Sequence, residues 1–140
     1  MADIQLVFDH ALNLTLFNTT QGKVLRPMLP VRLTYNGTSI DVDAIVDTGA
    51  DFPTFYKGVA TSLGIPDKQM KSDRATMLKG RVPTWYCPIG IDFLGKHFDC
   101  LAGFVDNPEW PAAIGRETIF SILKFAFRES QGQFYISSLP

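Results

Sequence analysis

The chain contains the stretch Ala44-Ile45-Val46-Asp47-Thr48-Gly49-Ala50-Asp51, in which apolar, β-branched residues run directly into a carboxylate, a hydroxyl and a glycine. This pattern predicts a buried strand that stops in a tight loop, so that a rigid element presents Asp47. Gly49 allows the backbone conformation that a sharp loop needs. Asp, Thr and Gly are also common turn formers, so an ordinary polar turn is an alternative interpretation of these residues taken alone.

A β-hairpin is predicted immediately before this loop. Two runs of alternating apolar and polar residues, 31–35 and 40–46, flank Asn36-Gly37. Asn-Gly between two such runs is typical of a hairpin with a type I′ turn, because both residues tolerate positive φ. Asp47 is therefore expected at the far end of the second strand. Further upstream, Leu12, Leu14 and Leu16 predict one half-buried strand, followed by a connector around Gly22 and Pro27.

The chain after Asp51 predicts a second hairpin, a terminal strand pair and two short helices. Residues 54–63 are expected to form a short helix closed by Gly64. Alternating residues 85–93 and the apolar run 98–105 predict a hairpin that turns at Gly95-Lys96. A second short helix is expected to bury Ile119, Phe120, Ile122 and Leu123. The last strands turn around Gln131-Gly132, so we expect an all-β unit with one or two short helices.

Composition limits the classes of function. At 140 residues and 46% hydrophobic content the chain predicts one domain with a core, and its net charge of −1 shows no bias toward nucleic acid or anionic membrane. It has neither a basic leader followed by an apolar run nor the about 20 apolar residues of a membrane span. We therefore expect a cytoplasmic protein, or a soluble domain excised from a larger one.

Other chemistries find little support in the sequence. Cys87 and Cys100 lack metal-ligand spacing and are expected to be buried free thiols, and His10 and His97 have no metal-binding partner at helical spacing. No metal or cofactor is therefore expected. A basic cluster near Trp85 and Tyr86 is interpreted as a solvated surface in preference to a nucleic-acid patch, because the net charge is near zero. Its members are Lys68, Lys71, Arg74, Lys79 and Arg81.

The order of these features resembles the retropepsin-like aspartic proteases, the single-lobe relatives of pepsin that include the retroviral proteases. Two separated motifs carry the resemblance, residues 47–51 and Ile114-Gly115-Arg116-Glu117, and it runs from about Leu29 to Ile136. It implies a closed, β-barrel-like acid protease fold with one lobe per chain, active as a homodimer. The whole chain, 1–140, is then one domain, with an N-terminal strand and connector over 1–26 and the core over 27–137.

The resemblance also implies residue roles. Asp47 corresponds to the catalytic carboxylate, and Thr48 and Gly49 support its loop. Ala50 and Asp51 line the substrate channel, and Asp51 forms a structural ion pair with Arg116. Ile114-Gly115 packs beneath the loop.

A mobile hairpin that covers the site, the flap, is expected between Arg74 and Tyr86. Its tip lies near Lys79-Gly80, and Lys79, Gly80 and Arg81 are expected to contact substrate.

Two functional hypotheses follow. In the first, the protein is an aspartic endopeptidase that cleaves extended polypeptides with a water nucleophile. This chemistry needs two carboxylates that share one proton, and the chain has one Asp-Thr-Gly, so a homodimer with two facing copies of Asp47 is expected. In the second, the protein is a catalytically inactive module of the same fold that dimerises or binds peptides.

Overall fold

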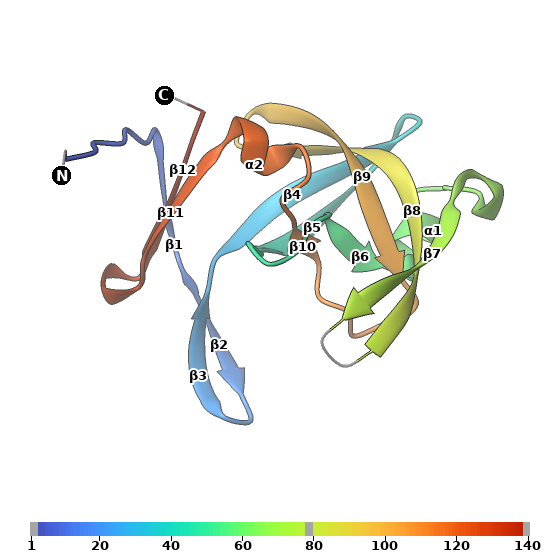
Figure 1. The fold of residues 1–140 in the computed structure, drawn as a ribbon, viewed down its shortest axis with the longest axis horizontal. Coiled ribbons are helices and arrows are strands. Elements are labelled where there is room, and N and C mark those ends of the chain that lie inside the picture. The colour runs from blue at the N-terminus through green and yellow to red at the C-terminus, as the bar shows by residue number, and fades with distance from the viewer. Residues whose placement is uncertain (1–2, 78–79, 139–140) are drawn as a thin grey trace.

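The structure, a computed structural model, describes residues 3–77 and 80–138, with the side chains of 73–81 left out of that description. Figure 1 shows the fold. The strands are β1 (His10–Asn13), β2 (Thr15–Thr19), β3 (Gly22–Arg26), β4 (Met28–Tyr35), β5 (Thr38–Val46), β6 (Thr54–Tyr56), β7 (Lys71–Met77), β8 (Gly80–Phe93), β9 (Lys96–Val105), β10 (Ala113–Ile114), β11 (Lys124–Arg128) and β12 (Gln133–Ser137). The helices are α1 (Lys57–Ser62) and α2 (Ile119–Ile122), and the 3₁₀ turns are η1 (Asp67–Gln69) and η2 (Glu129–Gln131).

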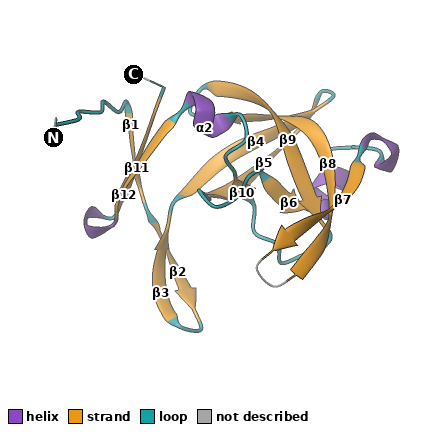
Figure 2. Ribbon diagram, viewed as in Figure 1, coloured by secondary structure: helices purple, strands orange, loops and turns teal. Residues whose placement is uncertain are grey.

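The strands form three sheets. The largest has the order β4-β5-β10-β6-β9-β8-β7, and β4 also pairs with β8, which closes six of its strands into a barrel. A second sheet has the order β1-β12-β11, and β2 pairs with β3 alone. Figure 2 shows how strand dominates the molecule, with short helices at its margins. The expected all-β, barrel-like fold with two short helices is confirmed.

The barrel interior takes the apolar residues that the alternating pattern assigned to it. Leu33 and Ile91 are fully buried and come from runs that alternate in the sequence, and Phe104 is fully buried within the apolar run 98–105. The same pattern continues at the barrel end, where Phe93 stacks on Phe98 with the ring centroids 5.1 Å apart. Burial of alternate residues holds each strand in register, because a slip by one residue would turn this whole set toward water.

The predicted turns of the two central hairpins are found at or next to their expected positions. Asn36 and Gly37 both have positive φ, 46° and 84°, as a type I′ turn requires. The second hairpin turns at Leu94 and Gly95, one residue earlier than predicted, because Lys96 already pairs with Phe93. Between the last two strands, the turn lies at the predicted Gln131-Gly132, and Gly132 adopts the left-handed conformation there.

The expected single strand through Leu12, Leu14 and Leu16 is wrong. The chain is divided at Leu14, whose N–H donates to the carbonyl of Gly132 over 2.8 Å. Residues before it form β1 and pair with β12, whereas residues after it form β2 and leave the sheet. Leu16 is therefore 56% exposed. The expected connector around Gly22 is instead the second strand of a β2–β3 hairpin.

Both short helices exist, and the first begins later than predicted. Residues Thr54–Tyr56 form β6, because they pair in parallel with residues 103–105 of β9, and helix α1 follows. Gly64 ends α1 as predicted, with φ of 75° and its N–H donating to the carbonyl of Thr61. No helix in the described residues is long and apolar enough to cross a membrane.

Helix α2 has four residues, and Ile114 belongs to β10 before it. Its expected buried face is partly wrong. Ile119 and Leu123 are buried, whereas Ile122 is 52% exposed, because so short a helix turns one narrow side toward the core.

The two cysteines are free and buried, as predicted. Burial raises the pKa of the Cys87 thiol, and burial and the nearby charges of Glu117 and Asp99 raise that of Cys100 to about 12. Since the thiolate is the reactive form, we expect a thiol reagent at pH 8 to label native protein at least about 100-fold more slowly than denatured protein. The absorbance of the chromophore that the reagent releases gives the labelling rates of native and denatured protein. Rapid labelling of both native thiols would contradict the buried placement.

Candidate active site

Asp47 lies at the carboxyl end of β5, where two neighbouring strands hold the backbone. β4 pairs with β5 on one side, and β10 pairs in parallel on the other, with Ile114 opposite Val46. The N–H of Asp47 donates to the carbonyl of Ile114 over 3.0 Å. The backbone at Asp47 is therefore held by strands on both sides. The predicted placement of Asp47 at the far end of the hairpin is confirmed.

The loop after β5 folds back on the Asp47 side chain. The N–H of Gly49 donates to Oδ1 of Asp47 over 2.9 Å, and the N–H of Ala50 donates to its carbonyl over 3.3 Å. Asp47, Thr48 and Gly49 are all exposed. One carboxylate oxygen is therefore held in place by the backbone, while the group as a whole stays open to solvent and to an incoming molecule.

The second motif of the sequence lies directly beneath this loop. The N–H groups of Arg116 and Glu117 each donate over 2.8 Å, to the carbonyls of Ala50 and Asp51 respectively. The carboxylate of Glu117 accepts from the N–H of Leu101 over 3.1 Å, which ties the motif to β9. The structure thus joins the two motifs through backbone hydrogen bonds.

Gly115 is the point of closest approach between motif and loop. A Cβ added there would collide with the carbonyl of Phe52 and lie 2.8 Å from the carbonyl oxygen of Ala50. Only a residue without a side chain fits this gap.

The ion pair that the resemblance implied between Asp51 and Arg116 is not formed in the described part of the chain. The guanidinium of Arg116 instead donates from Nη1 to the carbonyl of Thr48 over 3.5 Å. It also lies over the ring of Phe120, 5.5 Å from the centroid. Arg116 therefore supports the loop through a carbonyl and an aromatic face, and the Asp51 carboxylate forms no ion pair with any residue that the structure describes.

A pocket of about 400 Å³ opens beside Asp47. Its lining is Phe17, Arg26, Met28, Asp43, Ile45, Asp47, Pro111 and Ala112. Phe17 and Arg26 come from the β2–β3 hairpin, and sequence reasoning missed them because that segment was taken for a connector. The signal that could have found them is the pair of apolar runs on either side of the polar residues 18–22.

The hairpin formed by β7 and β8 occupies the segment predicted as a flap. It begins at Lys71, three residues before the expected boundary, and its last described pair joins Met77 to Gly80. Lys79 lies outside the described residues, as does the side chain of Arg81. The predicted substrate contacts of Lys79, Gly80 and Arg81 therefore stay predictions.

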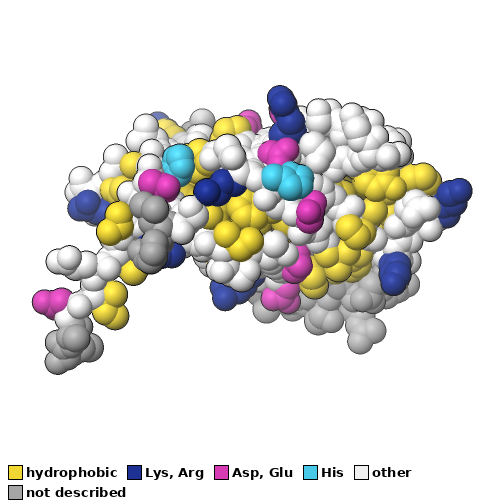
Figure 3. Space-filling model, turned by 90° about the horizontal axis from the view of Figure 1, so that it is seen from above, with side chains coloured by type: hydrophobic (Ala, Val, Ile, Leu, Met, Phe, Trp, Pro, Cys, Tyr) yellow, Lys and Arg dark blue, Asp and Glu magenta, His cyan; other side chains and the backbone are white. Residues whose placement is uncertain are grey.

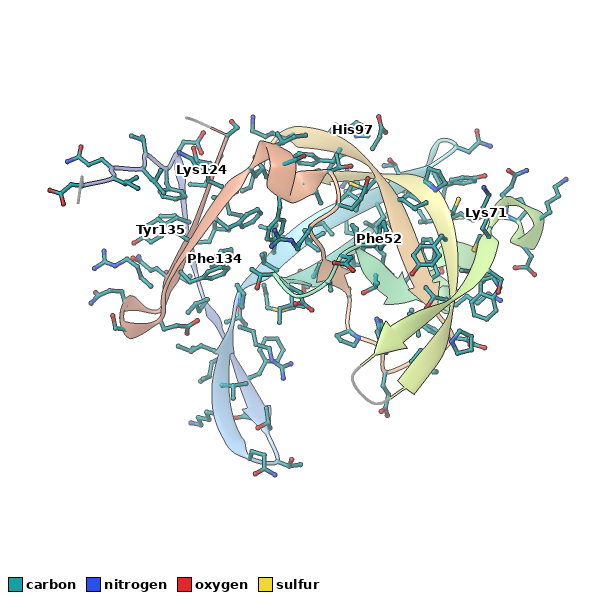
Figure 4. All side chains as sticks on the ribbon, viewed as in Figure 1. Phe52, Lys71, His97, Lys124, Phe134 and Tyr135 are labelled. Atoms are coloured by element: carbon teal, nitrogen blue, oxygen red, sulfur yellow. The ribbon has the colours of Figure 1, made fainter. Side chains whose placement is uncertain are left out.

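The base of this hairpin is packed against the segment that follows Asp51. Phe52 makes an edge contact with Tyr86, with the ring centroids 5.5 Å apart, and Lys57 lies over the Trp85 ring at 4.0 Å. Figure 4 shows Phe52 close to the strands that lead into the hairpin. Movement of the hairpin would therefore act on the residue next to the loop. The lysine that contacts Trp85 is Lys57 of α1, which is not a member of the basic cluster identified in the sequence.

His97 lies outside the Asp47 pocket, between two acids of the barrel surface. Nδ1 contacts Asp92, and Nε2 lies 2.9 Å from Asp99. Figure 3 shows a histidine flanked by acidic side chains on one face of the molecule. Among the described residues no group of three or more His, Cys, Asp or Glu is arranged to hold a metal ion.

The two acids make His97 a pH-dependent contributor to stability. Hydrogen bonding to Asp92 and then Asp99 raises the pKa of His97 above its usual value. A raised folded-state pKa stabilises the protein below the unfolded pKa, and this contribution is lost as pH rises through the folded pKa. We expect His97→Gln to lower the melting midpoint slightly at about pH 5.5 and not at about pH 9. Equal shifts at both pH values would contradict this origin.

With the geometry in place, the chain can be compared with known proteins. No protein-family model and no curated protein sequence matches it. Among solved structures it is similar to EIAV protease complexed with the inhibitor HBY-793, with a TM-score of 0.53 and 24% sequence identity. The match covers 65% of this chain and 82% of that one. The chain has the fold of a single-lobe retropepsin. That likeness bears out the fold class expected from the order of the sequence motifs.

Proposed function

We propose that the protein is an aspartic endopeptidase that hydrolyses peptide bonds in extended polypeptides as a homodimer. The observation that carries the proposal is the placement of Asp47 on this fold. Its carboxylate is exposed, it borders a largely apolar pocket, and backbone hydrogen bonds from Gly49 and to Ile114 hold it. The similarity to a retroviral protease supports the same reading.

The proposed chemistry needs a second carboxylate. Two carboxylates a few ångströms apart cannot both ionise easily, so the pair holds one proton between them. The ionised group takes a proton from water as the water oxygen bonds to the scissile carbon, while the protonated group donates a hydrogen bond to the carbonyl oxygen. The C–N bond then breaks, and the leaving amine takes a proton from the carboxyl pair. One chain supplies one Asp-Thr-Gly, so a two-fold axis beside Asp47 brings the second. Thr48 lies exposed next to Asp47, where its hydroxyl bonds across that axis.

Substrate contacts follow from which polar groups of the loop are free. The carbonyls of Ala50 and Asp51 already accept from Arg116 and Glu117. The N–H and carboxylate of Asp51 have no partner within the described residues. These two groups contact the peptide backbone, and the apolar pocket beside Asp47 receives a side chain. The β7–β8 hairpin, with Lys79, Gly80 and Arg81 at its end, adds a strand to the extended peptide.

The test is cleavage of an unfolded polypeptide between pH 3 and pH 7 over a range of enzyme concentrations. Because only the dimer holds both carboxylates, specific activity should rise with concentration and level off when dimerisation is complete. Asp47→Asn is the control. Dimers that form and show no cleavage would reject the enzyme and favour the inactive module of the same fold.

A further inference from the structure

The β2–β3 hairpin stands apart from the rest of the molecule. Among the described residues its two strands pair only with each other. Figure 1 shows the hairpin projecting away from both the barrel and the β1-β12-β11 sheet. An isolated two-stranded hairpin is at best marginally stable in water, so this one needs a surface to lie against.

The exposed apolar side chains of the hairpin also indicate that it packs against another surface. Leu16 and Leu25 are directly opposite each other and are 56% and 41% exposed. On the other face, Phe17 is opposite Val24 and is covered by the guanidinium of Arg26, 5.0 Å from the ring centroid. The hairpin is therefore apolar on both faces, and the described part of the chain leaves the Leu16–Leu25 face uncovered.

The hairpin also borders the place to which a second subunit must come. Phe17 and Arg26 line the pocket that contains Asp47. If two copies of Asp47 meet, as the proposed function requires, elements beside this pocket lie next to the two-fold axis. The inference that follows rests on that proposed function.

Charge also favours a second copy of this chain as the partner of the hairpin. Residues 15–26 include Lys23 and Arg26 and no acidic residue. Residues 43–51, which end in the loop after β5, include three acids, Asp43, Asp47 and Asp51, none of which forms an ion pair within the described residues. A second copy of this chain thus offers an acidic surface to a basic hairpin.

We propose that the β2–β3 hairpin is an intersubunit arm that lies against a second copy of this chain and buries Leu16 and Leu25 there. Each subunit then holds its partner with one arm, as an isologous interface requires. The arm of each subunit also keeps one wall of its own Asp47 pocket, with Phe17 and Arg26, in place. Dimerisation and pocket formation are therefore coupled through this hairpin.

The test compares dimer dissociation constants of full-length variants by sedimentation velocity. Leu16→Ser combined with Leu25→Ser removes the apolar contact, and Lys23→Glu reverses a charge at an exposed position. Lys68→Glu is the matched control, since Lys68 is exposed on η1 at the far side of the molecule. Far-UV circular dichroism checks that each variant keeps its sheet content.

We expect the leucine variant to weaken dimerisation at least about tenfold, Lys23→Glu to weaken it by a smaller factor, and Lys68→Glu to leave it unchanged. Wild-type dissociation constants in both hairpin variants would overturn the proposal. So would unchanged dimerisation with a raised KM, which would assign the hairpin to substrate.

Failure of the proposed function can be distinguished from failure of the arm, because cleavage tests the function and dimerisation tests the arm. Hairpin-dependent dimers that never cleave a polypeptide would support the arm and reject the protease. If the protein cleaves a polypeptide and the hairpin variants keep the wild-type dissociation constant, the protease is supported and the arm is rejected.

Discussion

Asp47→Asn should lower peptidase activity by at least about 10³-fold and leave the fold unchanged. An amide cannot accept the proton of the attacking water, so the substitution removes the base and not the binding pocket. The side chain is exposed, and an amide oxygen can still accept from the N–H of Gly49 as Oδ1 does now over 2.9 Å. The free energy of unfolding should therefore change by no more than about 0.5 kcal/mol. Initial cleavage rates and thermal melts measure the two quantities.

A mixing experiment makes this prediction specific to a shared site. If each active dimer needs Asp47 from both subunits, wild-type protein mixed with an equal amount of Asp47→Asn retains about one quarter of the activity at constant total protein. Independent sites in each subunit would retain about one half. A residual activity near one half would reject the two-carboxylate mechanism even if the single variant is inactive.

Gly115→Ala should destabilise the protein by about 3 kcal/mol or more and abolish activity with it. The new methyl group would collide with the carbonyl of Phe52 and press on that of Ala50. Hydrogen bonds from Arg116 and Glu117 hold the carbonyls of Ala50 and Asp51, directly before Phe52, so relief requires the loop after β5 to move. Chemical denaturation measures the stability change, and cleavage at low temperature separates loop displacement from unfolding.

Gly37→Ala is the matched control for Gly115→Ala. Gly37 has φ of 84°, and an added Cβ there would meet no atom within 4 Å. Its replacement should therefore cost only the left-handed backbone strain, about 1–2 kcal/mol, and leave cleavage intact. Equal costs at both positions would show that the contact beneath the loop is not tight.

The local patterns of the sequence were sufficient for the strands of the two central hairpins and for the position of Asp47. Alternation identified Leu33, Ile91 and other buried residues, and Asn36-Gly37 marked the turn that leads to the loop. These features depend on residues close together in the chain, where strand period and turn conformation are properties of the local backbone. The order of the two motifs was enough to indicate the acid protease fold.

Features that depend on distant partners were mispredicted or missed. Residues 54–56 were predicted as the start of a helix, yet parallel pairing with β9 makes them a strand, the state that Thr, Phe and Tyr favour. The Arg116 guanidinium donates to the carbonyl of Thr48, 68 residues away in the chain, and does not pair with Asp51 as the resemblance implied.

The sequence by itself determined the strand period, the Asn-Gly turn and the loop that exposes one carboxylate, because each arises from neighbouring residues. Only the tertiary structure decided that Gly115 lies against that loop and that Phe17 and Arg26 line the pocket beside it. Such contacts join segments far apart in the chain, and their geometry is set by how the sheets close and pack. No local pattern encodes that closure.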